Sequence, residues 1–169
     1  MRVFLTGFMG AGKSSVGRLV GELLHLPFVD LDGYIEEQAG RPIAEIFSDV
    51  GEVGFRALES EALVEIAQLS GVVVATGGGI VGTESNRQMM HAAGTIVWLD
   101  PDIDTILSRL SDQAIAERPL LGSHEEARRL WQTRVAHYED CDLRIRVHSD
   151  EGARAVAGRV VAHLTVAGA

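Results

Sequence analysis

A glycine-rich stretch near the N-terminus, Gly7-Phe8-Met9-Gly10-Ala11-Gly12-Lys13-Ser14, constrains the fold of this chain more than any other feature. It reads G-x-x-x-x-G-K-S and directly follows a short apolar run at 3–6. Its glycines let the backbone curl until successive amide groups point into one hollow, and a following helix adds the positive end of its dipole. The stretch therefore predicts a phosphate-binding loop between a buried strand and a helix.

This loop also predicts how a nucleotide is held. Lys13 is expected to reach the β- and γ-phosphates, and the Ser14 hydroxyl is expected to bind Mg²⁺, which prefers hard oxygen ligands. Lys13 is the single lysine in the chain, whereas arginine supplies the rest of the 15 Lys and Arg residues. The arginine-rich usage by itself indicates only a compositional bias. A compact ammonium nevertheless suits the inside of the loop better than a guanidinium does. The residues expected to contact ATP here are Gly10, Ala11, Gly12, Lys13, Ser14 and Ser15.

Composition excludes several classes of function. A net charge of −9 argues against a general binder of nucleic acid or of anionic membranes. Cys141 is the single cysteine, so no internal disulfide is expected. The N-terminus enters a strand at once without the pattern of a signal peptide, and no apolar run approaches the length of a membrane span. We expect a monomeric cytoplasmic protein whose partners are small molecules.

Strand-length apolar runs alternate with segments of helical spacing along the chain. This alternation predicts one α/β domain with a parallel sheet covered by helices on both faces. The expected strands are 3–6, 28–31, 72–76, 95–99 and 143–147. The expected helices are 15–24, 33–38, 42–49, 52–69, 84–92, 102–110, 124–138 and 152–164. Gly51 is expected to end the helix that begins at Pro42, and 111–123 loses its periodicity and predicts a mobile loop.

Two carboxylates follow the second predicted strand. Asp30 and Asp32 stand two residues apart, so in an extended chain their side chains share one face. Ligands bind at the carboxyl ends of parallel strands, so these two side chains are candidates for Mg²⁺ handling and for contact with a substrate hydroxyl. The alternative is that Asp32 only caps the next helix. We favour the functional interpretation.

Three further features are candidates for substrate contact. Gly77-Gly78-Gly79 follows a buried strand, where the absence of Cβ atoms lets the backbone approach a ligand closely, although a flexible turn would use the same residues. Arg56, Arg118 and Arg134 are separately weak candidates, because most surface arginines are only solvated charges. Arg118 is the strongest of them. It lies in the irregular loop beside Pro119, where a guanidinium could neutralise charge on a transferring phosphoryl group.

Taken together, these motifs resemble those of the shikimate kinase family along nearly the whole chain. The resemblance rests on the loop at 7–14 and on eight later segments: Asp30-Leu31-Asp32, Gly40-Arg41-Pro42-Ile43, Ile46-Phe47, Phe55-Arg56, the triple glycine, Arg118-Pro119-Leu120-Leu121, Arg134 and Tyr138. It implies a three-layer P-loop fold like that of nucleoside-monophosphate kinases, with a five-stranded parallel sheet in the order 2-3-1-4-5. It also implies ATP-dependent phosphorylation of the 3-hydroxyl of shikimate, within aromatic amino acid biosynthesis.

The resemblance assigns roles residue by residue. Asp32 resembles the carboxylate that binds the reacting hydroxyl and accepts its proton, and Asp30 resembles the outer partner of Mg²⁺ beside Ser14. Arg56 and Arg134 resemble the clamp on the carboxylate of shikimate, which suits the forked geometry of guanidinium. The remaining assignments are backbone contacts from Gly77, Gly78 and Gly79, ring packing by Phe47 and Phe55, phosphate and substrate contact by the lid residue Arg118, and adenine contact by Arg109.

Three departures and two alternatives accompany this resemblance. Gly54 stands where the family usually has a side chain, Glu117 brings a negative charge beside Arg118, and the adenine-side segment around 147–151 matches poorly. A related P-loop kinase such as gluconate kinase would share the phosphate loop but lack the set of Asp32, Arg56, Arg134 and triple glycine. A nucleotide-binding regulatory module without turnover is the alternative from another class, and the intact Lys13, Ser14, Asp32 and Arg118 argue against it.

Overall fold

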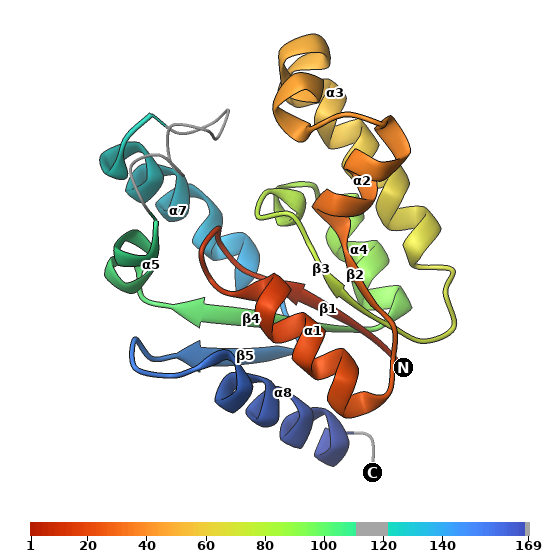
Figure 1. Cartoon of the computed structure of the whole chain (residues 1–169), viewed down its shortest axis with the longest axis vertical. Coiled ribbons are helices and arrows are strands. Elements are labelled where there is room, and N and C mark those ends of the chain that lie inside the picture. The colour runs from red at the N-terminus through yellow and green to blue at the C-terminus, as the bar shows by residue number, and fades with distance from the viewer. Residues whose placement is uncertain (111–121, 168–169) are drawn as a thin grey trace.

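The sheet at the centre of the molecule has five parallel strands. A computed structural model describes residues 1–110 and 122–167, and within them the strands run in the order β2-β3-β1-β4-β5 (Figure 1). They are β1 (Arg2–Thr6), β2 (Phe28–Asp30), β3 (Val72–Ala75), β4 (Thr95–Pro101) and β5 (Leu143–Val147). Each expected strand is found with its ends within two residues of the predicted ones. The α/β class, the parallel sheet and its order are therefore confirmed.

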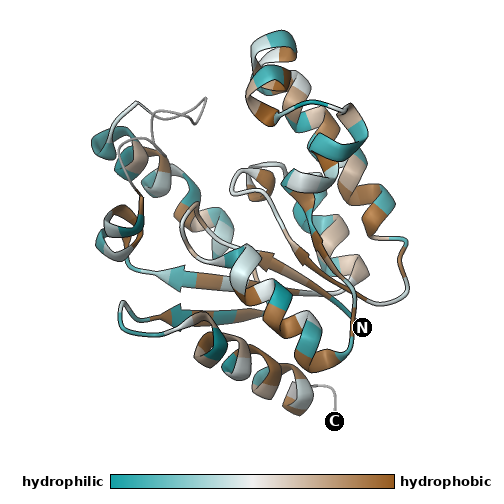
Figure 2. Ribbon diagram, viewed as in Figure 1, coloured by the Kyte–Doolittle hydropathy of each residue, from teal (hydrophilic) through white to brown (hydrophobic). Residues whose placement is uncertain are grey.

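Alternation along the central strands produces the layers on either side of the sheet. Val3 and Leu5 point into a cluster with α1 (Lys13–Leu24) and α8 (Ala153–Ala167), whereas Phe4 points into the opposite cluster. That second cluster includes residues of α3 (Ile43–Ile66), α4 (Glu84–Ala93) and α7 (His124–Tyr138). Both faces of the central strands β1 and β3 are therefore buried, which explains their nearly continuous apolar sequences in Figure 2.

A pair of helices extends beyond the sheet on the side of β2. α2 (Leu31–Ala39) and α3 follow β2, and in Figure 1 the N-terminal part of α3, drawn in orange, lies well above the sheet. Gly51 interrupts the helical geometry with φ 68° and ψ −175°, which confirms a break at the predicted residue. The two helices predicted on either side of it form one kinked helix, α3. A left-handed φ of this kind is a conformation that glycine adopts without a steric cost. The helix ends at Ile66 rather than at the predicted residue 69, and Leu69 is exposed.

Two short elements complete the described fold. A 3₁₀ turn, η1 (Ile80–Gly82), follows the triple glycine, and α5 (Ile103–Arg109) follows β4.

Most of the predicted mobile loop, including Glu117 and Arg118, lies outside the described residues. Among the helices of the described ranges, none combines the length and the apolar character that crossing a membrane requires.

Candidate active site

The phosphate loop adopts the curled geometry that its glycines predict. Gly7, Gly10 and Gly12 all have positive φ, and a Cβ built on Gly7 would lie 2.6 Å from the carbonyl oxygen of Leu99. Gly7 is therefore required both for its conformation and for its contact with β4. The Lys13 ammonium donates to the carbonyl oxygens of Gly7 and Phe8 at 2.8 and 3.0 Å. The lysine thus lies across its own loop at the start of α1.

A hollow of about 450 Å³ opens over this loop. Of the predicted nucleotide contacts, Gly10, Gly12, Lys13, Ser14 and Ser15 line it. Ala11 is buried beneath the loop in the cluster with α1 and α8. Arg109, at the exposed end of α5, is not among the lining residues, and Arg118 lies outside the described ones. This space, which we call the donor hollow, brings five of the six predicted loop residues together, and the adenine contact of Arg109 stays a prediction.

Ser14 and Asp30, the two residues predicted as oxygen ligands for a cation, lie in contact. The Ser14 hydroxyl donates to Asp30 Oδ2 at 2.5 Å, and both side chains line the donor hollow. A hydroxyl and a carboxylate in contact, next to a phosphate loop, fit Mg²⁺, because this ion is held by one or two protein oxygens together with substrate phosphates. The residues present therefore suit the ion that the resemblance implies.

The expectation that Asp30 and Asp32 share one face of an extended chain is wrong. Asp30 ends β2 and its carboxylate accepts a hydrogen bond from the Gly33 amide at 3.4 Å, so Asp30 is the residue that caps α2. Asp32 already lies in the first turn of that helix. Both side chains still line the donor hollow, because the turn from strand to helix keeps them at the carboxyl edge of the sheet.

A second, smaller hollow of about 100 Å³ adjoins the first and contains the predicted acceptor residues. Phe47 and Phe55 from α3 form one wall, with their ring centroids 4.5 Å apart. Asp32, Arg56 and Arg134 are the predicted charged residues that line it. The triple glycine supplies its backbone edge, so each predicted substrate residue that the structure describes is brought together here: Asp32, Phe47, Phe55, Arg56, Gly77, Gly78, Gly79 and Arg134. We call this space the acceptor pocket.

Glu59 is a residue of this pocket that the sequence reasoning missed. Its side chain is fully buried, and Oε2 accepts a hydrogen bond from Arg56 Nη1 at 2.7 Å. Oε1 is buried without a hydrogen-bond partner among the described residues. Burial raises the pKa of Glu59, and the neighbouring Arg56 opposes that shift. The available signal was an acidic residue one turn after Phe55 on the apolar face of a helix.

The glycines explain how the arginines come so close to the backbone. A Cβ on Gly79 would overlap the Arg56 guanidinium, and a Cβ on Gly77 would overlap Glu59 and lie 2.9 Å from Asp32 Oδ1. The carbonyl oxygen of Gly78 accepts from the Tyr138 hydroxyl at 2.5 Å and from Arg134 at 3.4 Å. Burial lowers the pKa of Arg134. The triple glycine therefore makes room for charged side chains as well as for a ligand.

The donor hollow and the acceptor pocket meet at three residues. Met9, Asp32 and Gly78 line both spaces, so a group bound over the phosphate loop would face a molecule held by Arg56 and Arg134. This arrangement suits phosphoryl transfer, in which positioning and charge neutralisation contribute more than a strong base.

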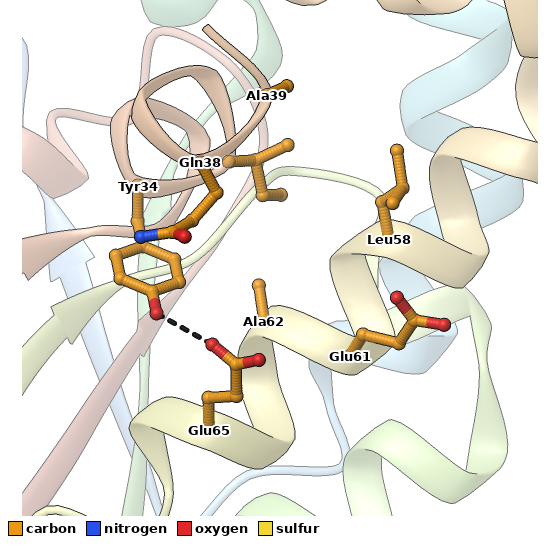
Figure 3. A pocket seen from close by; sticks show the side chains of 8 residues that line it. Tyr34, Gln38, Ala39, Leu58, Glu61, Ala62 and Glu65 are labelled. Carbon is orange, nitrogen blue, oxygen red and sulfur yellow. Dashed lines mark hydrogen bonds between the residues drawn. The ribbon is translucent and has the colours of Figure 1, made fainter.

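A third hollow lies apart from this chemistry. Between α2 and α3, Tyr34 and Gln38 face Leu58 and Glu65 across a cavity of about 190 Å³ (Figure 3). The Tyr34 hydroxyl donates to Glu65 Oε2 at 2.6 Å at its edge. This cavity contains none of the predicted site residues.

The fold and the two adjoining hollows together define a P-loop phosphotransferase that acts on a small acidic acceptor. Comparison with known proteins identifies its family. The family model of shikimate kinase matches residues 9–165. A shikimate kinase of Synechococcus elongatus is 40% identical over 162 residues, which cover 94% of this chain and 84% of that protein. The chain therefore belongs to the shikimate kinase family.

Solved structures agree with this assignment. A shikimate kinase from Acinetobacter baumannii in complex with shikimate superposes with a TM-score of 0.91 at 34% identity, covering 98% of this chain and 93% of that one. A gluconokinase from Sinorhizobium meliloti superposes with a TM-score of 0.53 at 16% identity, with coverage of 98% and 95%. The second likeness shows the fold alone.

Proposed function

We propose that this protein transfers the γ-phosphoryl group of ATP to the 3-hydroxyl of shikimate. The observation that carries the proposal is the junction of the two hollows at Asp32, with Arg56 and Arg134 among the residues that line the acceptor pocket. Gluconate is the less favoured acceptor, because the arginines, the triple glycine and the paired phenylalanines form a pocket for a flat, ringed acid.

On the donor side, the loop amides and Lys13 hold the triphosphate. Ser14 and Asp30 would hold Mg²⁺ through the hydroxyl and the carboxylate that already lie in contact. Bound there, the ion supplies positive charge to the β- and γ-phosphates. Lys13 would exchange its hydrogen bonds to the loop carbonyls for phosphate oxygens, so the nucleotide would meet a positive charge already in place.

On the acceptor side, each group orients one part of the ring. Arg56 and Arg134 bind the carboxylate, with Arg56 held by Glu59. Phe47 and Phe55 pack against the ring. The Asp32 carboxylate accepts a hydrogen bond from the 3-hydroxyl, which directs an oxygen lone pair at the γ-phosphorus. As the new P–O bond forms and the bond to ADP breaks, the hydroxyl proton passes to Asp32.

Five parts of the proposal rest on the sequence. Arg118 is proposed to contact the transferring phosphoryl group and Arg109 to contact adenine. The division into one domain with a lid at about 111–123 and substrate-binding helices at about 33–60 likewise stays a prediction, as do the cytoplasmic location and the monomeric state.

The test is an assay of ADP release by the full chain with ATP and Mg²⁺. We expect release that depends on shikimate, with gluconate giving only the background rate. Equal release with both acids would contradict the assigned acceptor. ATP binding without turnover on either acid would instead favour the nucleotide-binding regulatory module.

A further inference from the structure

Glu36 forms a hydrogen bond between the two helices that bracket the acceptor pocket. It lies on α2 one turn after Asp32, and its Oε1 accepts a hydrogen bond from the backbone amide of Ile43 at 2.8 Å. Ile43 is the first residue of α3. The two residues are seven apart in sequence but belong to different helices, so this contact fixes the start of α3 against α2.

The amide of Ile43 needs such a partner. The first amides of a helix have no acceptor within the helix. The residue that precedes α3 is Pro42, which provides no side-chain cap. A carboxylate from α2 therefore replaces the missing cap and also meets the positive end of the α3 dipole.

This contact lies between the two hollows of the active site. Glu36 itself lines the donor hollow, whereas Ile43 lines the acceptor pocket together with Phe47, one turn further along α3. Asp32, on the same helix as Glu36, belongs to both spaces. A shift of the first turn of α3 relative to α2 would therefore move one wall of the acceptor pocket relative to the group that binds the reacting hydroxyl.

We propose that Glu36 is a positioning residue for the acceptor, acting through the first turn of α3. This role rests on the proposed function. It requires an oxygen that accepts a hydrogen bond from the Ile43 amide, and it does not require the negative charge of Glu36. If Glu36 instead acted on the cation or the phosphates in the donor hollow, the negative charge would be required and the hydrogen bond to Ile43 would not. Glutamine at this position separates the two, because its Oε1 accepts a hydrogen bond but its side chain is neutral.

The experiment compares Glu36→Ala and Glu36→Gln with Glu37→Ala, which removes an exposed acid from the adjacent position of α2. We expect Glu36→Ala to raise the Michaelis constant for shikimate about fivefold or more, the size expected for a lost helix cap, with that for ATP changed less than about twofold. Glu36→Gln and Glu37→Ala should stay within about twofold of the wild type for both substrates. Hydrogen exchange of the Ile43 amide should accelerate about tenfold in Glu36→Ala and stay slow in Glu36→Gln.

Several results would overturn the inference. One is equal damage by Glu36→Ala and Glu36→Gln, which would assign the effect to the charge. Others are a rise in the Michaelis constant for ATP alone, or an Ile43 amide that exchanges as slowly in Glu36→Ala as in the wild type. If the wild type neither binds nor phosphorylates shikimate, the proposed function fails, and the α2–α3 contact is then decided by hydrogen exchange alone.

Discussion

The carboxylate of Glu59 lies 2.7 Å from the guanidinium of Arg56, one helical turn away, with Glu59 fully buried and Arg56 one-fifth exposed. Removing a carboxylate from water costs free energy that a single ion pair only partly returns, so this pair is weak evidence for stability. It does hold Nη1 of Arg56, whose Nη2 also pairs with Glu52 Oε1 at 3.3 Å, so that Arg56 is fixed where it lines the acceptor pocket. Glu59 is thus best understood as support for substrate binding.

Replacing Glu59 should change how the stability of the protein depends on pH. Burial raises the pKa of Glu59 in the folded state, so the native protein binds this proton more tightly than the unfolded chain does. The contribution of Glu59 to stability is then greatest below the unfolded pKa and is lost as pH rises through the folded pKa. Denaturant unfolding of the wild type and of Glu59→Gln between about pH 4 and pH 8 measures the difference.

The expected result is that the free energy of unfolding of the wild type falls relative to that of Glu59→Gln as the pH rises. Glu61→Gln, at an exposed position on the same helix, controls for the loss of an acid in general. A wild-type advantage that grows with pH would show that the ion pair with Arg56 outweighs burial.

Lysine is not expected to replace Arg56 without loss of shikimate binding. Arg56→Lys keeps a positive charge but loses the planar fork that can serve Glu59 and a substrate carboxylate together. We expect the Michaelis constant for shikimate to rise about tenfold, with that for ATP nearly unchanged. Arg41→Lys is the matched control, because Arg41 pairs with Asp49 at 2.9 Å on the surface. Equal effects on the two substrates would reject the carboxylate clamp.

Gly79 and Gly82 provide a test of the space beside Arg56. A Cβ on Gly79 would overlap the Arg56 guanidinium, whereas a Cβ on Gly82 would have no atom within 4 Å. Because the guanidinium is the end of a flexible side chain, Gly79→Ala should displace it at a small cost in stability and raise the Michaelis constant for shikimate about tenfold. Gly82→Ala should match the wild type in the same assay. A normal shikimate constant in Gly79→Ala would mean that Arg56 does not bind the acid.

How far the sequence predicts this molecule depends on how local each feature is. The strands were predictable because Val72, Val73 and Val74 are buried on both faces of the sheet and form a continuous apolar run. The kink at Gly51 was predictable because one residue type carries it. The order of the strands, in contrast, came from the resemblance, since it depends on contacts between segments far apart in the chain.

The candidate site was predictable where a residue type has one common use in a phosphate loop, as Lys13 and Ser14 have. The separate role of Asp30 came from the resemblance, because its spacing from Asp32 left the uses of the two carboxylates open. Glu59 was missed because its importance comes from burial beside Arg56, and an acid on a helix is usually solvated. The predicted geometry of Asp32 was wrong because β2 ends at Asp30, one residue earlier than the apolar pattern suggests, and α2 begins directly after it.

Variants of Asp30 and Asp32 should differ in how their activity depends on the Mg²⁺ concentration. Asp30 contacts Ser14, whereas Asp32 lines both hollows. Asp30→Asn should raise the Mg²⁺ concentration needed for half-maximal turnover, because it weakens one of the two proposed protein ligands. Asp32→Asn should lower turnover about a hundredfold even at saturating Mg²⁺, since an amide cannot take the hydroxyl proton. Titrations of activity with Mg²⁺ measure both. Recovery of Asp32→Asn at high Mg²⁺ would move Asp32 to the cation site.

The two tyrosines of the chain allow a matched test of the backbone at the triple glycine. The Tyr138 hydroxyl donates to the Gly78 carbonyl at 2.5 Å, and its ring stacks on Trp98 with centroids 5.9 Å apart. Tyr34 makes the corresponding bond to Glu65 at 2.6 Å, outside the active site (Figure 3). Tyr138→Phe keeps the stacked ring but leaves the half-buried Gly78 carbonyl with the longer bond from Arg134 at 3.4 Å.

We therefore expect Tyr138→Phe to lower the free energy of unfolding by about 1 kcal/mol and to raise the Michaelis constant for shikimate severalfold, because the Gly78 backbone edges the acceptor pocket. Tyr34→Phe should leave the shikimate constant unchanged. Burial raises the pKa of Tyr138 well above its usual range, so its hydroxyl stays a donor and the difference should persist across pH 6 to 9. Kinetics and chemical denaturation of both variants decide the matter. Equal shikimate constants in the two would show that the Tyr138 bond stabilises the core without positioning Gly78.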